Sequence, residues 1–231
     1  MSQLLLGGID QAFTRGGNRY CFVSPTDRNV CVKVLRPDRS PEVRRAEKRF
    51  PKNVKPVGLF DDNLAEFRVY QRIDQSIGEP AYDVIARCYG FVDTDLGRGL
   101  SSELIRDDNG LISITLKQYL WERGVDAMIE PSLKRFCDHW QRHGMPSRNL
   151  LLHNIVVQQA ENSIRRLVVI DGLGWPGLAP LAYHLPALAR YKAARKVKNL
   201  YGAIENLLNK KRQNSDYGYH GWLTQTQRES I

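Results

Sequence analysis

The order of the predicted elements constrains the fold of this chain more than any other feature. Residues 13–23 contain two glycines and then an apolar, aromatic run. Residues 30–35 are β-branched and apolar except for one lysine, and residues 24–29 between the two segments are turn formers. Two such runs around a turn predict a β-hairpin. Helical patterns dominate the rest of the chain, and strands followed by helices are typical of an α+β protein. We therefore expect an α+β chain with two lobes, residues 1–112 and residues 113–231.

The helical segments repeat their apolar residues at the spacing of one helix face. In residues 62–73, Leu64, Phe67 and Tyr70 recur every third position, which predicts a helix with one buried side. The apolar residues of a long late segment, 181–212, follow the same rule. We also predict a short helix at 41–50, helices at 113–121 and 133–143, strands at 84–92, 100–106, 155–157 and 167–170, and a loosely ordered tail at 213–231.

Composition limits the class of protein and its surroundings. Of the 231 residues, 42% are hydrophobic and 26% charged, which is close to the globular average and excludes disorder. The four cysteines form no C-x-x-C pair, as is typical of reduced thiols in a cytosol. The longest apolar stretch, residues 167–188, is broken by an aspartate, a histidine and three prolines. A membrane-spanning helix needs about 20 apolar residues, so we expect a cytoplasmic protein.

Lys33 stands in the middle of an apolar run that otherwise reads as a core strand. Burying an unpaired charge is costly, so a lysine at such a position needs a partner. Glu66 is the expected partner, because its helix is amphipathic and directly precedes the next strand. Glu47 is the alternative partner, and an exposed lysine on an edge strand would explain the pattern without any partner.

Asn154 and Asp171 flank the second predicted hairpin. Asn154 ends a polar loop ahead of one short strand, and Asp171 ends the other strand, directly before Gly172. We expect their side-chain oxygens to lie close enough to share one cation. An aspartate in a turn before glycine is also common for structural reasons alone.

These residues occur in an order that resembles protein-kinase-like folds. The parts are a glycine-containing hairpin, a strand lysine, a helix glutamate, a loop asparagine and a strand-end aspartate: Gly16 and Gly17, Lys33, Glu66, Asn154 and Asp171. Residues 16–35, 65–73, 113–120 and 153–157 resemble the YrbL family of PhoP-network proteins, which are small bacterial proteins with a kinase-like fold. The pair of His153 and Asn154 is also similar to the loop of lipopolysaccharide sugar kinases.

The resemblance implies a bilobal kinase-like fold and a site for ATP and magnesium. Lys33 would contact the α- and β-phosphates, and Glu66 would hold Lys33 in place. The hairpin at residues 14–19, with its two glycines, would cover the phosphates. Asn154 and Asp171 would bind magnesium through oxygen, the ligand that this cation prefers.

The catalytic loop departs from the kinase pattern. Asn149 stands where kinases place the catalytic aspartate, and Leu151 where the usual lysine follows. Residues 14–18, TRGGN, are not the full G-x-G-x-x-G. Asparagine can orient a hydroxyl group but is not basic, so slow turnover or none is expected. An Asn149→Asp variant should then raise turnover at least about tenfold, since general-base catalysis contributes roughly 10²–10⁴ in rate.

Two functions follow from this comparison. The first is an ATP- and magnesium-dependent phosphotransferase for a small-molecule or sugar hydroxyl, with the lipopolysaccharide core as one candidate acceptor. The second is a pseudokinase that acts as a regulator or scaffold in an envelope-stress pathway. A protein substrate is not favoured, because about a dozen residues after Asp171 leave little room for a peptide-docking segment.

The formal net charge is +9, which concerns partners and not the fold. The late helix carries a basic run made of Arg190, Lys192, Arg195, Lys196 and Lys198, joined by Lys210, Lys211 and Arg212. Such a run favours peripheral docking on an anionic membrane surface, such as lipid A phosphates or the inner leaflet, at about 1 kcal/mol for each charge. A solvated helix face is the simpler explanation. A nucleic-acid partner is not favoured, because no nucleic-acid-binding motif accompanies the charge.

Overall fold

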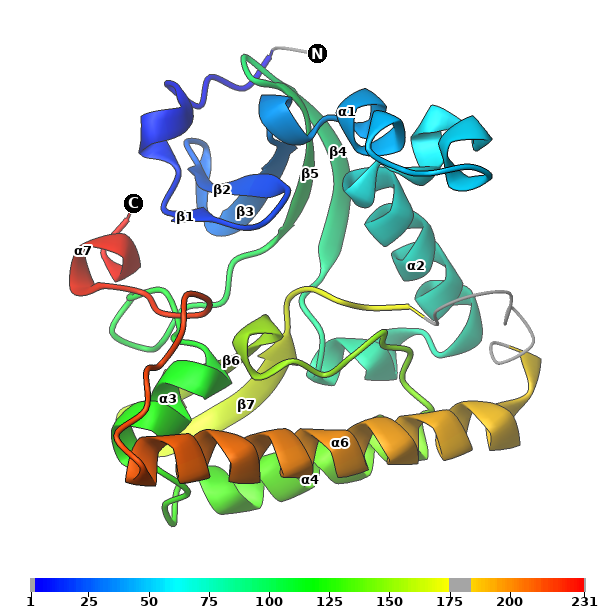
Figure 1. Cartoon of the computed structure of the whole chain (residues 1–231). Helices are drawn as coiled ribbons and strands as arrows, with labels where there is room; N and C mark the ends of the chain where they lie inside the picture. Colours follow the sequence, from blue (N-terminus) through cyan, green and yellow to red (C-terminus); the bar gives the residue numbers. More distant parts are fainter. Residues whose placement is uncertain (1–2, 175–183, 231) are drawn as a thin grey trace. The chain divides into compact units, whose positions relative to one another are not determined.

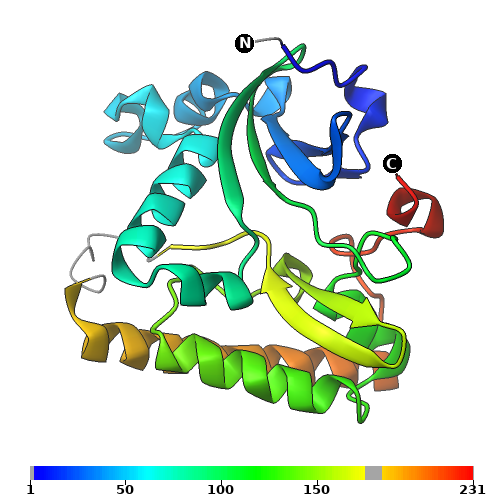
Figure 2. The same cartoon turned by 180° about the vertical axis from the view of Figure 1, so that it is seen from behind.

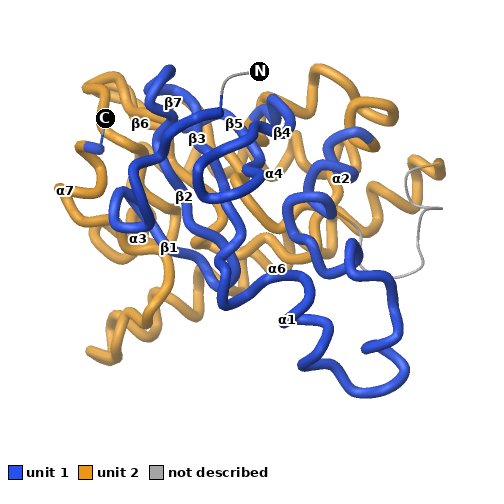
Figure 3. Tube along the Cα trace, turned by 90° about the horizontal axis from the view of Figure 1, so that it is seen from above, with its two compact units in different colours: residues 1–71, 87–104, 230–231 blue, residues 72–86, 105–229 orange. Residues whose placement is uncertain are grey.

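The computed structural model describes residues 3–174 and 184–230 and confirms the α+β class. The chain divides into two compact units, which Figure 3 colours separately. The first unit comprises residues 1–71, 87–104 and 230–231, and the second comprises residues 72–86 and 105–229. Both units therefore combine separated segments, whereas the predicted division has a single boundary after residue 112.

The first unit is built on a five-stranded sheet with the strand order β1-β2-β3-β5-β4, whose paired strands are all antiparallel (Figure 1). The strands are β1 (Thr14–Arg15), β2 (Arg19–Ser24), β3 (Asp27–Leu35), β4 (Cys88–Thr94) and β5 (Gly97–Glu103). The predicted hairpin of residues 13–35 is confirmed as β2 and β3. β4 begins four residues later than the strand predicted at residues 84–92, because residues 79–83 form a 3-10 helix.

The register of the sheet places Lys33 at its centre. Lys33 lies opposite Cys21 of β2 on one side and opposite Leu100 of β5 on the other. β3 is therefore not an edge strand, and the explanation of Lys33 as an exposed edge lysine is wrong. Phe22, Val32 and Leu6 form a buried apolar cluster of the same unit.

Two helices, α1 and α2, lie between β3 and β4 in the sequence. α1 (Pro41–Ala46) begins after Ser40, whose hydroxyl accepts a hydrogen bond from the backbone N–H of Val43. α2 (Asp62–Ser76) contributes residues 62–71 to the first unit and its last turn to the second. Phe67 of α2 packs against Phe91 of β4 with ring centroids 5.1 Å apart, as its predicted buried face requires.

In its described residues, the second unit contains three long helices and a hairpin. They are α3 (Leu116–Arg123), α4 (Ile129–Arg142), α6 (Pro186–Arg212), and the antiparallel pair β6 (Ile155–Ala160) and β7 (Ser163–Val169). α4 and α6 run side by side in Figures 1 and 2. A Cβ on Gly144, just beyond α4, would lie 2.7 Å from the Cβ of Ala189, so only glycine permits this close approach to α6. Residues 181–183 of the predicted late helix lie outside the described residues.

The expectation of a loosely ordered tail is wrong for the described part of residues 213–230. Gln118 of α3 accepts a hydrogen bond from the backbone N–H of Leu223 at 2.9 Å and donates one to its carbonyl oxygen at 3.1 Å. Arg228, in the short helix α7 (Gln225–Arg228), pairs with Asp107 at 2.8 Å. Lys117 donates to the carbonyl oxygen of His220 at 2.8 Å. These contacts fasten the tail to the second unit.

Among the described helices, none is long and apolar enough to cross a lipid bilayer.

Candidate active site

Lys33 and Glu66 form a buried ion pair in the first unit. Lys33 Nζ lies 2.7 Å from Glu66 Oε1, and each side chain is 8% exposed. The pairing predicted from the sequence is therefore confirmed, whereas its role toward a nucleotide stays a prediction. Glu47, the alternative partner, pairs instead with Arg39 at 2.8 Å.

The ion pair belongs to a wider buried network that the sequence analysis missed. The second carboxylate oxygen of Glu66 binds the guanidinium of Arg19, at the start of β2. Asn63, one turn before Glu66 on α2, donates to the carbonyl oxygen of Lys33 at 2.9 Å and accepts from Arg19 at 3.3 Å. The network holds the Glu66 carboxylate from its other side and fixes the backbone of Lys33, so it positions the ion pair. Its sequence signal was the presence of polar Asn63 and Glu66 on the same face of an amphipathic helix.

Gly16 and Gly17 form the turn between β1 and β2. The backbone N–H of Gly16 donates to the carbonyl oxygen of Arg19 at 2.8 Å, and the Arg36 guanidinium donates to both glycine carbonyls at 3.3 Å. A Cβ on Gly17 would meet nothing within 4 Å, and one on Gly16 would make an ordinary contact at 3.5 Å. The local fold therefore does not require glycine at either position.

The β6–β7 hairpin brings Asn154 and Asp171 to the same end of one element in the second unit. The carbonyl oxygen of Asn154 accepts from the backbone N–H of Ile170 at 2.9 Å, which continues the hairpin pairing up to Asp171. Asp171 Oδ1 accepts from the backbone N–H of Gly172 at 2.6 Å. Gly172 has φ +80°, and a Cβ there would lie 3.0 Å from Asn154 Nδ2. The Asn154 side chain thus lies against the residue that follows Asp171; a shared cation stays a prediction.

The loop at residues 147–154 is clamped to the segment that follows Asp171. The backbone N–H of Arg148 donates to the carbonyl oxygen of Gly172 at 2.9 Å, and the N–H of Gly174 donates to that of Pro146 at 3.2 Å. An antiparallel bridge joins Ser147 to Leu173 between them. This clamp sets the position of the next residue, Asn149, relative to the Asp171 turn.

Lys196 of α6 contacts this loop, and its predicted place in a basic surface run is wrong. Lys196 is 8% exposed, and its Nζ donates to the carbonyl oxygen of Arg148 and, at 3.1 Å, to Asn149 Oδ1. Burial lowers the pKa of Lys196, and the charges of Arg195 and Lys192 lower it further. A lysine therefore meets the loop in space, although the loop sequence itself lacks the usual lysine.

Comparison with known proteins agrees with the family resemblance. A family model described as PhoP regulatory network protein YrbL matches residues 9–205, which is most of the chain. The chain belongs to the YrbL family. The family resemblance inferred from the sequence is therefore confirmed.

Two relatives and one solved structure show how similar this chain is to known proteins. The YrbL proteins of Escherichia coli (strain K12) and of Shigella flexneri are each 26% identical to this chain over 174 residues, or 72% of this chain and 72% of the relative. Among solved structures, the crystal structure of Rad53 1–466 in complex with AMP-PNP aligns with 15% identity and a TM-score of 0.49. The alignment covers 90% of this chain and 52% of the Rad53 chain, so this chain spans about half of that structure.

The tail of this YrbL family member contacts His153, which belongs to the loop at residues 147–154. The rings of His153 and His220 lie 5.5 Å apart, and Gly221 approaches so closely that a Cβ on it would lie 2.6 Å from that of His153. Burial lowers the pKa of His153, and the neighbouring His220 and Lys117 lower it further, against the opposing charge of Asp171. No local pattern in the sequence indicates this contact, because the partners lie far apart along the chain.

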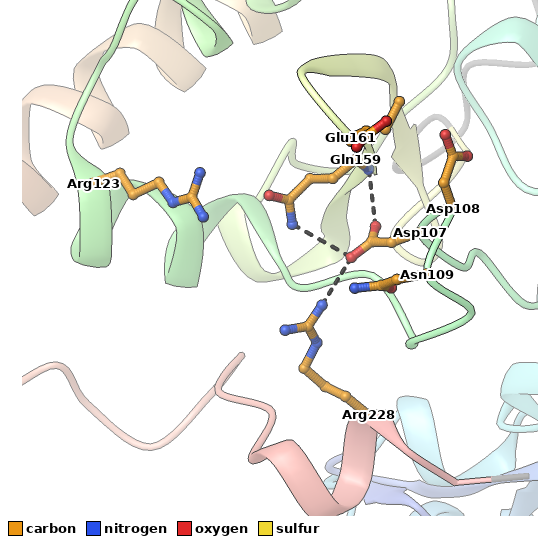
Figure 4. A pocket seen from close by; sticks show the side chains of 8 residues that line it. Asp107, Asp108, Asn109, Arg123, Gln159, Glu161 and Arg228 are labelled. Carbon is orange, nitrogen blue, oxygen red and sulfur yellow. Dashed lines mark hydrogen bonds and ion pairs between the residues drawn. The ribbon is translucent and has the colours of Figure 1, made fainter.

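A pocket of about 570 Å³ lies elsewhere in the second unit (Figure 4). Its side chains include Asp107, Asp108, Asn109, Arg123, Gln159, Glu161 and Arg228. The central carboxylate, Asp107, accepts hydrogen bonds from Ser113 Oγ at 2.6 Å, from the backbone N–H of Gln159 at 2.9 Å, and from Arg228 at 2.8 Å. Because both of its oxygens are engaged, we interpret the pocket as an attachment point for the tail.

Proposed function

We propose that this protein is an ATP- and magnesium-dependent phosphotransferase of the kinase-like type. The observation that carries the proposal is the buried pair of Lys33 and Glu66 on a central strand and its following helix. A buried ammonium is costly, and the Glu66 carboxylate offsets this cost while it fixes the direction of Lys33. In kinases a strand lysine held by a helix glutamate contacts nucleotide phosphates. We assign the same task to Lys33, and the covering of the phosphates to Gly16 and Gly17.

Asn154 and Asp171 fit a magnesium ion through the chemistry of their donors. Both offer side-chain oxygen, and magnesium uses only one or two carboxylates with water and phosphate oxygens as its other ligands. Among the residues that the structure describes, no group of three or more His, Cys, Asp or Glu side chains gathers as a metal site would. When bound, the ion would neutralise phosphate charge.

A pseudokinase is the second candidate, and the contact between Asn149 and Lys196 favours it. An amide is not a base, and a lysine ammonium at 3.1 Å makes this position still less able to accept a proton. Phosphoryl transfer depends mostly on positioning and on charge neutralisation, so slow turnover remains compatible with the site. The pseudokinase would act as a regulator or scaffold in an envelope-stress pathway.

The acceptor that we propose is a small-molecule or sugar hydroxyl, with the lipopolysaccharide core as a candidate. This part of the proposal is supported by the likeness of His153 and Asn154 to the loop of lipopolysaccharide sugar kinases. The short interval between Asp171 and α6 also leaves little sequence for a peptide-docking segment.

A thermal-shift measurement tests the proposal. ATP, ADP and GTP are each added with and without magnesium, because a ligand that binds the native state raises its melting temperature by mass action. We expect an ATP-dependent rise that needs magnesium, and its loss in Lys33→Met and Asp171→Ala. Lys55→Met, which removes an exposed lysine of the first unit, is the matched control and should keep the rise. If no nucleotide raises the melting temperature and calorimetry detects no heat of binding, both the phosphotransferase and a nucleotide-binding pseudokinase are contradicted.

A further inference from the structure

Residues 43–59 expose large apolar side chains to solvent in the first unit. Phe50 is 80% exposed, Val54 70% and Leu59 57%, and Val43 is exposed as well. Every residue from 46 to 56 is exposed to solvent. Single exposed apolar residues are ordinary, but four within one short segment mark a surface that gains by being covered.

The same segment is strongly basic. It contains six basic residues and one acidic residue: Arg44, Arg45, Lys48, Arg49, Lys52, Lys55 and Glu47. Glu47 is engaged by Arg39, and Arg44 pairs with Asp62 at 2.8 Å. The remaining five basic residues lie in the same segment as the exposed apolar side chains and give it a net positive charge.

Hydrogen bonds hold the backbone of residues 43–59 at several points, so the exposed side chains stand on an ordered backbone. Ser40 caps α1 at one end, and Arg44 also donates to the carbonyl oxygen of Phe60 at the other. Between these points lie two short 3-10 helices, Lys52–Val54 and Val57–Leu59. Covering Phe50 and its neighbours would consequently require little additional ordering of the chain.

We propose that residues 43–59 dock this protein on the surface of an anionic lipid bilayer. Cations attract the negative leaflet, and apolar side chains among them enter the boundary between headgroups and acyl chains. A second copy of the chain is a poor occupant, because two such basic surfaces repel each other. Single-stranded nucleic acid is a poorer fit, because its bases stack on aromatic rings, and three of the four exposed apolar residues here are aliphatic. This proposal is independent of nucleotide binding.

The basic run of α6 is the competing membrane surface. Arg195 and Lys198 are exposed there, whereas Lys196 is buried against the loop at Arg148 and Asn149. The burial of Lys196 removes one charge from that run. Reversing the charge of each surface separately therefore tests which of the two surfaces binds lipid.

Vesicle co-sedimentation of the full chain tests the proposal. Vesicles of phosphatidylglycerol with phosphatidylcholine are compared with phosphatidylcholine alone, at low and high salt. We expect binding only to the anionic vesicles and weaker binding in salt, because such attraction is screened. The triple variant Lys48→Glu, Lys52→Glu and Lys55→Glu should lose at least tenfold in partition coefficient, since each cation contributes about fivefold.

Two further variants separate the parts of the surface. Phe50→Ser with Val54→Ser should weaken binding severalfold at unchanged charge. Arg195→Glu, Lys198→Glu and Lys210→Glu together change the charge as the first triple variant does and should keep most of the binding. All of these side chains are exposed, so the melting temperature of each variant should match that of the unmodified protein.

Three results would overturn the proposal. One is equal binding to neutral and anionic vesicles, or to neither. Another is loss of binding in the α6 variant but not in the variant of residues 48, 52 and 55. The third is binding to a single-stranded oligonucleotide without binding to vesicles, which would assign the surface to nucleic acid.

Discussion

Lys196 of α6 donates a hydrogen bond to the side-chain oxygen of Asn149 at 3.1 Å and also binds the neighbouring carbonyl oxygen of Arg148. Asn149 therefore does more than mark the absence of a catalytic base. The position that would hold a catalytic aspartate is in direct contact with a buried cation. An aspartate there would meet an ion-pair partner.

The contact changes what Asn149→Asp should do. The sequence alone predicts a gain of at least about tenfold in turnover, within the roughly 10²–10⁴ that a general base contributes. Lys196 would hold the pKa of an aspartate at 149 below its usual range, so the new carboxylate would be a weak base. We expect the single variant to gain little, and Asn149→Asp with Lys196→Met to exceed it at least about tenfold in ATP hydrolysis.

Lys196→Met alone is the control for that comparison, because it reports any damage to the loop. Its melting temperature and nucleotide binding are measured alongside its turnover. A full gain in the single Asn149→Asp variant would show that Lys196 does not suppress the carboxylate. Equal activity of the single and double variants would show the same.

Glu66 should matter more to stability than Lys33 does. Removing Glu66 leaves Lys33 and Arg19 buried without their shared carboxylate, a change that costs roughly 3–5 kcal/mol in buried pairs. Removing Lys33 leaves Glu66 bound to Arg19, so Lys33→Met should cost less, on the order of 1–2 kcal/mol. Urea unfolding of Glu66→Ala and Lys33→Met measures the difference. Equal losses would mean that Arg19 contributes nothing to the network.

Gly17 of the first unit and Gly172 of the second differ in how much the local backbone requires glycine, which gives a matched pair of variants. Gly17→Ala should change the free energy of unfolding by less than about 0.5 kcal/mol, because nothing obstructs the added methyl group. It should nevertheless weaken nucleotide binding severalfold if this turn covers the phosphates. Gly172→Ala should destabilise by roughly 1–3 kcal/mol, because of its positive φ and its contact with Asn154. Unchanged nucleotide affinity in Gly17→Ala would remove the turn from the site.

Local patterns predicted the parts of the site whose partners lie on regular elements. Lys33 was recognised because it interrupts an apolar strand, and Glu66 because it lies on an amphipathic helix, so their pairing needed only one inference about packing. Arg19 was missed because a single charged residue at the start of a strand has no periodic signal.

Contacts between distant segments were not predictable in the same way. Lys196 reads as one member of a basic helix face, and only the fold shows that a loop 47 positions earlier reaches it. The tail gave no periodic pattern either, since Leu223 is held by polar contacts to Gln118, 105 positions away. Sequence periodicity records which face of an element is buried but does not record its partner.

The contact of the tail with His153 should weaken in acid. The pKa of His153 is lowered from its ordinary 6.5 by burial and by the nearby His220 and Lys117. The unfolded state therefore binds a proton at His153 more readily than the folded state. The stabilising contribution is complete above pH 6.5 and is lost as the pH falls through that value toward the lower folded pKa.

Limited proteolysis of the tail measures this effect. As the pH falls from about 7.5 to about 5, cleavage after residue 213 should increase, because a charged His153 would be repelled by Lys117. Tryptophan fluorescence reports the same release, since Tyr217 of the attached tail packs against Trp121 of α3 with ring centroids 5.4 Å apart. His153→Gln keeps a polar side chain that does not titrate and should flatten the pH dependence. A pH dependence that survives in His153→Gln would assign the effect to another group, and a tail equally resistant at both pH values would show that His153 does not govern its attachment.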